Sequence, residues 1–128
     1  MRRVLVLNCG SSTLKWAVLD AADESTVSEG CERLRDGAAE PVSAVLDRVD
    51  DVDAVGHRIV HGGTLFRETV LVDAQVRARL ESLVELDPLH MRRALASVDA
   101  VRARILSLPQ FAVFDTAFHA TLPEPAAG

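Results

Sequence analysis

The sequence predicts an α/β domain built around one mixed β-sheet. Three short segments of strand-like composition come first, separated by turn residues, which favours antiparallel hairpins. Segments with apolar residues at helical spacing then alternate with two further apolar runs, a pattern typical of helices that connect parallel strands. With 128 residues, the chain is long enough to bury a core of its own in a single domain.

The first half of the chain is expected to hold three strands and one helix. The strands are placed at about residues 3–8, 14–20 and 26–33, although the apolar alternation of the third is weak. Pro41 suits the start of a helix, where its missing N–H costs no hydrogen bond. A short amphipathic helix is predicted because apolar residues then recur at helical spacing: Val42, Val45, Leu46 and Val49.

The second half is expected to alternate strands with helices. The stretch 54–63 predicts a strand that runs into a glycine turn. Asp73 is placed as the N-cap of a helix over about 74–86, and a second helix follows a proline break at about 92–107. A last buried strand is predicted over 110–115, with an acidic residue at its carboxyl end.

Right-handed crossovers would place the last two strands parallel to the first, beside the hairpin sheet. The result is a mixed five-stranded sheet, three antiparallel strands followed by two parallel ones, flanked by helices. This is the ribonuclease-H-like arrangement of the actin-like ATPase and sugar kinase superfamily. Topology alone is a modest argument for function, because one fold hosts many activities.

Composition and charge exclude several classes of protein. The net charge of -5 and the pI near 5.3 disfavour nucleic-acid binding, since no basic stripe is present. The paired arginines Arg92-Arg93 and Arg102-x-Arg104 are interpreted as a solvated helix face. No apolar run reaches membrane length, and Cys9 and Cys31 are expected to be free thiols in a reducing compartment. We therefore expect a cytoplasmic protein without membrane partners.

The turn from Asn8 to Lys15 has the composition of a phosphate-binding turn. Gly10 allows close approach of an anion, and the hydroxyls of Ser11, Ser12 and Thr13 surround it with donors. Lys15 is the one lysine among 14 basic residues, and a lysine is a compact point charge suited to a phosphate oxygen. The alternative is an ordinary hairpin with a polar tip.

Three further polar clusters fall at strand ends or breaks, and each has a structural alternative. Arg58 is flanked by His57 and His61, which would lie together on the opposite face of the strand. These two residues are interpreted as structural histidines bonded to backbone. A zinc site is poorly supported, because no third ligand lies at a fixed spacing from them. His90 follows Pro88 and is a possible helix cap. Asp115, near His119, is a possible N-cap or a buried ion-pair partner of Arg58.

Together these clusters contain the groups that phosphoryl transfer needs: cations, hydrogen-bond donors, a metal ligand and a carboxylate. Four motifs resemble, in order, the signatures of the acetate kinase family: Asn8-Cys-Gly-Ser-Ser-Thr-Leu-Lys15, Val55-Gly-His-Arg-Ile-Val-His-Gly-Gly63, Pro88-Leu-His90, and Val113-Phe-Asp-Thr-Ala-Phe-His119 with Leu122-Pro123. The resemblance covers nearly the whole chain but less than half of a family member. It implies an N-terminal carboxylate-kinase domain over 1–123 and a tail at 124–128.

The resemblance also implies ATP and Mg²⁺ as cofactors, with transfer of phosphate from ATP to acetate or another short-chain carboxylate. It assigns roles residue by residue to the positions that match. Asn8 would help hold magnesium, while Lys15 with Gly10, Ser11, Ser12 and Thr13 would face the nucleotide phosphates. Arg58 would clamp the substrate carboxylate, Val60 and Leu89 would line its apolar pocket, His90 would donate to the phosphoryl group, and Asp115 would orient the acceptor.

The chain departs from the family pattern in several places. Thr13 replaces a serine, Met91-Arg92-Arg93 stands where the family usually has Asn-Pro-Pro, and the segment before Val55 is shorter than usual. The family's C-terminal nucleotide-binding domain does not follow, so we expect negligible activity from the chain alone. The alternative is an inactive anion-binding or protein-interaction domain. The resemblance suggests a homodimer at full length and leaves acetate and propionate undistinguished.

Overall fold

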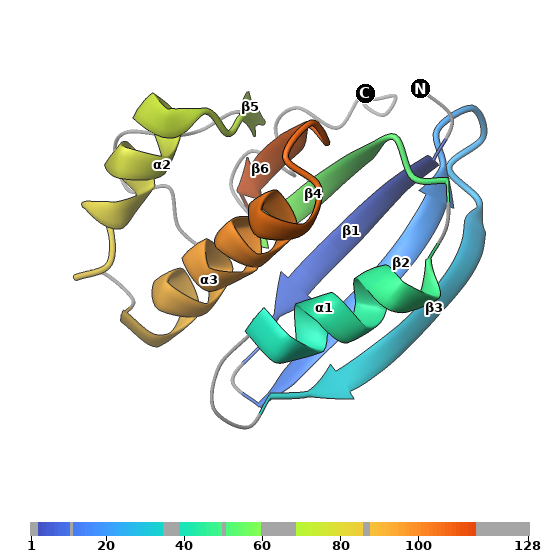
Figure 1. Ribbon diagram of the computed structural model, residues 1–128, viewed down its shortest axis with the longest axis horizontal. Helices are drawn as coiled ribbons and strands as arrows, with labels where there is room; N and C mark the ends of the chain where they lie inside the picture. Colours follow the sequence, from blue (N-terminus) through green and yellow to red (C-terminus); the bar gives the residue numbers. More distant parts are fainter. Residues whose placement is uncertain are drawn as a thin grey trace.

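The computed structural model describes residues 3–10, 12–34, 39–49, 51–59, 69–85 and 88–114. These residues form one sheet with helices packed on one of its faces (Figure 1). In chain order the elements are β1 (Arg3–Cys9), β2 (Thr13–Asp20), β3 (Thr26–Arg33), α1 (Ala39–Arg48), β4 (Ala54–Ile59), β5 (Val70–Leu71), α2 (Ala74–Glu81), α3 (Pro88–Arg104) and β6 (Gln110–Phe114).

The strands form a mixed sheet in the order β3-β2-β1-β4-β6-β5. β1, β2 and β3 pair antiparallel, while β4 runs parallel to β1 and β6 runs parallel to β4. The predicted fold class is confirmed, with three antiparallel strands followed by two parallel ones. The sheet has a sixth strand, β5, which pairs antiparallel with β6 at the edge and was not predicted, because two residues cannot show an alternating pattern.

Two helices begin or end close to their predicted positions. α1 starts at Ala39, so Pro41 lies in its first turn. Asp73 is the N-cap of α2 as predicted, and its Oδ1 accepts a hydrogen bond from the Val76 N–H at 2.8 Å. α2 ends at Glu81 rather than near residue 86.

The third helix differs most from its prediction. α3 begins at Pro88 and ends at Arg104, whereas the sequence predicted a helix over 92–107. Proline fits at the first helical position, where its fixed φ is already helical. The segment expected to break the chain therefore starts α3, and His90 lies inside its first turn rather than in a loop or at a cap.

The apolar core lies between the sheet and the helices (Figure 1). On β1 and β2, Leu5 and Leu14 are fully buried and belong to one cluster with Val45 of α1 and Val101 of α3. A second cluster joins α2 and the first half of α3 to β4 and β6: Ile59, Leu80, Leu83, Met91, Ala94, Leu95 and Ala112. The three helices in the described part of the chain thus bury their apolar sides against the same face of the sheet.

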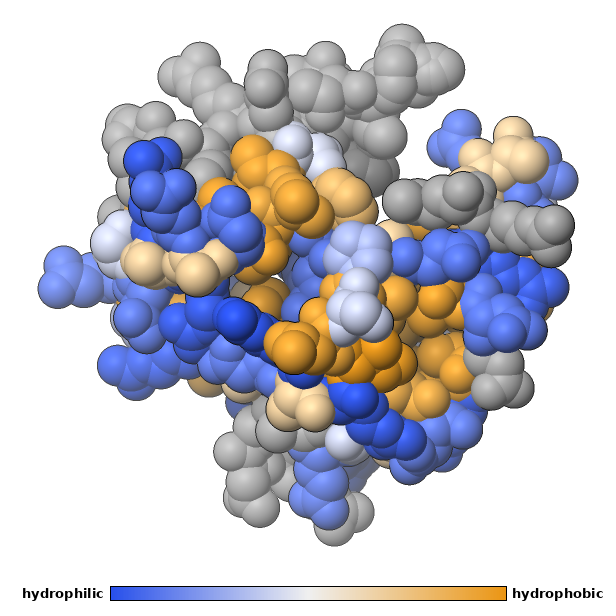
Figure 2. Space-filling view, turned by 45° about the horizontal axis from the view of Figure 1, so that its top comes forward, coloured by the Kyte–Doolittle hydropathy of each residue, from blue (hydrophilic) through white to orange (hydrophobic). Residues whose placement is uncertain are grey.

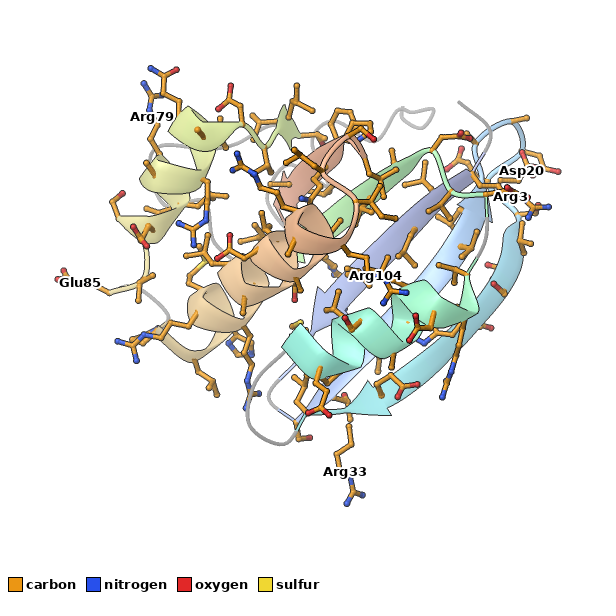
Figure 3. All side chains as sticks on the ribbon, viewed as in Figure 1. Arg3, Asp20, Arg33, Arg79, Glu85 and Arg104 are labelled. Carbon is orange, nitrogen blue, oxygen red and sulfur yellow. The ribbon has the colours of Figure 1, made fainter. Side chains whose placement is uncertain are left out.

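Two arginines of the described helices link them to one another. Arg77 of α2 donates from Nε and Nη2 to the two carboxylate oxygens of Asp99 on α3, both at 2.7 Å. Arg104 of α3 reaches α1, where Nη1 donates to the Ser43 carbonyl at 3.2 Å and Nη2 pairs with Asp47 (Figure 3). The arginine face that was predicted to be solvated therefore also fixes helix packing.

On the face seen in Figure 2, hydrophilic side chains surround groups of apolar ones. Leu71 and Leu106 are 51% and 75% exposed. None of the helices in the described ranges is long and apolar enough to span a membrane. Cys9 and Cys31 are both free thiols, as predicted.

Candidate functional site

Three of the predicted site residues share one face and one edge of the sheet. In the antiparallel pair β1–β2, Asn8 stands directly opposite Lys15. In the parallel pair β1–β4, Val6 stands beside Gly56, so Asn8 and Arg58, each two residues further on, point to the same face. Asn8, Lys15 and Arg58 therefore project from the edge where β1 and β4 end and β2 begins.

The described helices pack on the opposite face. Each of the three site residues is preceded in sequence by a side chain that points toward the helices. These preceding residues, which are at most 2% exposed, are Leu7, Leu14 and His57. Lys15 and Arg58 are exposed instead. Because successive side chains of a strand point to opposite faces, the same strands supply both the core and the candidate site.

An open hollow of about 390 Å³ lies on this face and is lined by Asn8 and Lys15. Glu29 and Cys31 of β3 line it from the neighbouring strand. The remaining lining residues are Val6, Trp16, Ala17 and Gly30. Its volume is in the range of small-molecule sites.

Three carbonyl groups of the turn between β1 and β2 accept hydrogen bonds from other groups of the protein. The Gly10 N–H donates to the Thr13 carbonyl at 2.7 Å, and the Leu34 N–H donates to the Ser12 carbonyl at 2.9 Å. The third carbonyl, that of Gly10, accepts from Arg93 Nη1 at 3.1 Å. An anion is repelled by carbonyl oxygens and attracted by N–H and O–H groups, so a turn with engaged carbonyls suits anion binding.

The first turn of α3 lies at the same edge of the sheet. α3 runs antiparallel to β1, β4 and β6, so its N-terminus lies where those strands end (Figure 1). His90 is half-buried there, and Leu89 is 48% exposed. The positive end of the helix dipole and the strand ends therefore face the same side of the molecule.

Some of the predicted site residues are outside the described residues. β6 ends at Phe114, immediately before Asp115. Arg58 is exposed, and the alternative of an ion pair with Asp115 involves a residue outside the described part of the chain. The residues whose predictions lie outside the described part of the chain are Ser11, Val60, His61, Asp115 and His119.

His57 has a structural role, but not with the partner that was predicted. Its Nε2 lies 2.5 Å from Oε1 of the Gln110 side chain, and Gln110 Nε2 donates to the Val98 carbonyl at 3.1 Å. Because an amide oxygen only accepts, His57 Nε2 must be the donor. Burial lowers the His57 pKa to about 4, so the ring is neutral at pH 7.

Arg93 was interpreted as part of a solvated helix face, and this was wrong. The side chain is half-buried and bonded to the turn through Gly10. Nearby, Ser97 Oγ donates to the Arg93 carbonyl at 2.9 Å and lies 3.1 Å from Cys9 Sγ. Burial raises the pKa of the Cys9 thiol, against the smaller lowering effects of the Ser97 hydrogen bond and the Arg93 charge. In the sequence, the one signal that drew attention to Arg93 was that Met91-Arg92-Arg93 stands where the family usually has Asn-Pro-Pro.

Among the described residues, no group of three or more His, Cys, Asp or Glu side chains is arranged to hold a metal ion. An amide oxygen such as that of Asn8 is a different kind of ligand, and Mg²⁺ binds proteins through one or two oxygen ligands while it keeps several waters. The half-buried Asn8 side chain beside the hollow fits such a ligand.

Comparison with known proteins finds a matching protein family and similar proteins. A family model described as the Acetokinase family matches residues 39–128. The chain is 41% identical to an acetate kinase from Arthrobacter sp. over 144 residues, which cover 96% of this chain and 37% of the relative.

Two solved structures are similar in fold and sequence. An acetate kinase from Porphyromonas gingivalis superposes with a TM-score of 0.81 at 32% identity, covering 97% of this chain and 40% of that one. A propionate kinase from Francisella tularensis gives a TM-score of 0.79 at 29% identity, covering 96% and 39%. The chain thus spans at most two fifths of the length of each of these proteins.

Proposed function

This chain belongs to the Acetokinase family, and we propose that it forms the substrate-binding part of a carboxylate kinase. In the proposed reaction a carboxylate oxygen attacks the γ-phosphorus of ATP, the bond to the bridging oxygen of ADP breaks, and the products are ADP and an acyl phosphate. Because the chain spans so little of its relatives' length, we propose the transfer for the whole protein and binding of the reactants for the chain.

One observation carries this proposal. Asn8, Lys15 and Arg58 come from three strands, yet they project from one open face at the carboxyl edge of β1 and β4. That edge is where open α/β sheets bind their ligands. Two cations and an amide at that edge provide the charges and the oxygen ligand that a nucleotide phosphate, a carboxylate and a magnesium ion need.

The phosphates are proposed to bind at the β1–β2 turn. Lys15 supplies a point charge, and Ser12 and Thr13 supply hydroxyl donors beside it. Ser11 and Gly10 are proposed to contribute a further hydroxyl and the close approach of the backbone. The hydrogen bonds to the carbonyls of this turn support the proposal, since they occupy carbonyl oxygens that would otherwise repel a phosphate.

The carboxylate and Mg²⁺ are proposed to bind beside this turn, at the carboxyl ends of β4 and β1. Arg58 would hold the carboxylate through two parallel hydrogen bonds, and Asn8 would hold Mg²⁺ directly or through a water. When bound, Mg²⁺ supplies charge neutralisation at the transferred phosphate. We further propose that His90 donates to that phosphate, that Leu89 and Val60 line an apolar pocket, and that Asp115 orients the acceptor.

The proposed partners are therefore a nucleotide and a short-chain carboxylate. A cytoplasmic location, suggested by the composition, and a homodimer at full length, suggested by the resemblance, are part of the same proposal. The names of the two similar solved structures, an acetate kinase and a propionate kinase, support a short acyl chain and leave its length open.

Calorimetric titration of the chain with acetate and with Mg·ATP tests these assignments. Arg58→Ala is expected to weaken acetate binding about tenfold or more, because a charge-assisted bidentate pair is lost, while Lys15→Ala changes acetate binding far less. For Mg·ATP the order of the two variants should reverse. Equal effects of both variants on acetate, or no effect of either, would contradict the proposed clamp.

A further inference from the structure

The β1–β2 turn is held by one side chain from a distant part of the chain. Among the described residues, two of the hydrogen bonds to turn carbonyls come from backbone N–H groups, those of Gly10 and Leu34. The third comes from Arg93 of α3, which is 83 residues from Gly10 in sequence and donates from Nη1 at 3.1 Å. Without this side chain the Gly10 carbonyl would lose the partner that turns it inward.

The α3 residues around Arg93 are themselves fixed against β1. Ser97, one helical turn further on, is 1% exposed, donates from Oγ to the Arg93 carbonyl and lies beside Cys9 Sγ. Cys9 is the residue immediately before Gly10. The guanidinium and the carbonyl that it binds are therefore both anchored by the same contact between α3 and the end of β1.

We propose that Arg93 is a positioning residue for the phosphate-binding turn, an inference that rests on the function proposed above. A guanidinium that holds the Gly10 carbonyl toward α3 keeps the negative end of that peptide dipole away from the open face. The carbonyl then does not have to turn away when an anion binds, and binding requires no reorganisation of that peptide.

Arg93 also places a permanent positive charge behind the turn. A guanidinium stays ionised at all physiological pH values, so this charge attracts an anion bound on the other side of the peptide. The two effects differ in their response to salt. Long-range attraction is screened as ionic strength rises, whereas the orientation of a peptide plane is not.

Three variants of the chain separate these effects. Arg93→Met keeps the length of the side chain and removes its donors and its charge, and Arg93→Lys keeps a charge and one possible donor. Arg92→Met is the matched control, since it removes an exposed arginine one position earlier on α3. The first readout is hydrogen exchange of the Gly10 amide in the ligand-free chain, which reports opening of the turn because this N–H is bonded to the Thr13 carbonyl. The second readout is the affinity for Mg·ATP, measured at low and high salt.

Arg93→Met is expected to speed exchange of the Gly10 amide at least tenfold and to weaken Mg·ATP binding about tenfold at both salt concentrations. Arg93→Lys should lose less of the affinity, and Arg92→Met should change both readouts less than twofold. The inference is overturned if Arg93→Met and Arg92→Met behave alike, or if the affinity loss of Arg93→Met disappears at high salt.

Failure of the proposed function has a different signature. If the unmodified chain does not bind Mg·ATP at millimolar concentrations, the proposed function fails, and the exchange measurement alone then decides the role of Arg93. Unchanged exchange at Gly10 in both Arg93→Met and Arg93→Lys would overturn the positioning role. Should Arg93→Met fail to fold, Arg93→Lys supplies the same comparison against Arg92→Met.

Discussion

The two faces of the sheet are built from alternate residues of the same strands, yet one is a packed core and the other a candidate ligand site. On β2, Leu14 is fully buried and Lys15 is exposed. On β4, His57 is buried beneath α3 and Arg58 is exposed on the open face. A step of one residue along either strand therefore exchanges a group that stabilises the fold for a group placed to bind a ligand.

Because of this alternation, we expect substitutions of neighbouring strand residues to affect either stability or ligand binding, but not both. A substitution on the helix face changes burial and packing, while one on the open face changes charge in a partly solvated hollow. If the separation fails, the assignment of the open face to ligand binding fails with it.

Leu14→Ala is expected to have the largest effect on stability. Leu14 is 0% exposed in the cluster shared by β1, β2, α1 and α3, so its truncation removes apolar contacts and leaves a cavity. We expect the free energy of unfolding to fall by about 2–5 kcal/mol in urea titrations. A loss below about 1 kcal/mol would mean that this face is not the core.

Gly30→Ala tests how closely the core face is packed at the edge of the hairpin. A Cβ built at Gly30 lies 2.6 Å from Cζ2 of the Trp16 indole, so the ring or the strand must move. Such overpacking costs about 1–3 kcal/mol, against the smaller gain from replacing glycine in a strand.

Gly56→Ala is the matched control for this substitution. A Cβ at Gly56 meets nothing closer than Val4 Cγ1 at 4.0 Å. Thermal unfolding should show a lower melting temperature for Gly30→Ala and an unchanged or slightly higher one for Gly56→Ala. The reverse order would contradict the close contact between Trp16 and Gly30.

His57 should make stability depend on pH between about 6.5 and about 4. Its pKa in the folded state is lowered to about 4 from 6.5, so below pH 6.5 the unfolded chain binds a proton that the folded chain does not. The contribution of neutral His57 is complete above pH 6.5 and is lost as the pH falls toward 4.

The slope due to His57 should approach about 1.4 kcal/mol per pH unit at its steepest. Unfolding free energies measured from pH 7 to pH 4 for the natural chain and for His57→Gln isolate it, because other titrating groups are common to both. Equal slopes for the two proteins would show that the His57 ring is not held neutral by burial.

Most of the fold could be predicted because its signals are local. Two short apolar runs and the polar turn between them located β1 and β2, and the Asp73 N-cap located the start of α2. Two features were missed for physical reasons. β5 has two residues and exists through its pairing with β6, and Pro88 starts a helix as readily as it ends one.

The sequence predicted which residues belong to the candidate site, but not the long-range hydrogen bonds that hold the site in place. The motifs selected Asn8, Lys15 and Arg58, and strand alternation then explains their shared face. The bond from Arg93 to Gly10 joins positions 83 residues apart, and nothing in a single sequence encodes such a contact. The Gln110 partner of His57 is a long-range pairing of the same kind.

The most direct test of the open face as the ligand site is the affinity of Lys15→Ala for Mg·ATP, measured together with its unfolding free energy. Loss of a charge-assisted hydrogen bond should weaken binding about tenfold to a hundredfold, while stability changes by less than about 0.5 kcal/mol because Lys15 is exposed. Unchanged affinity in a fully folded Lys15→Ala chain would contradict the account.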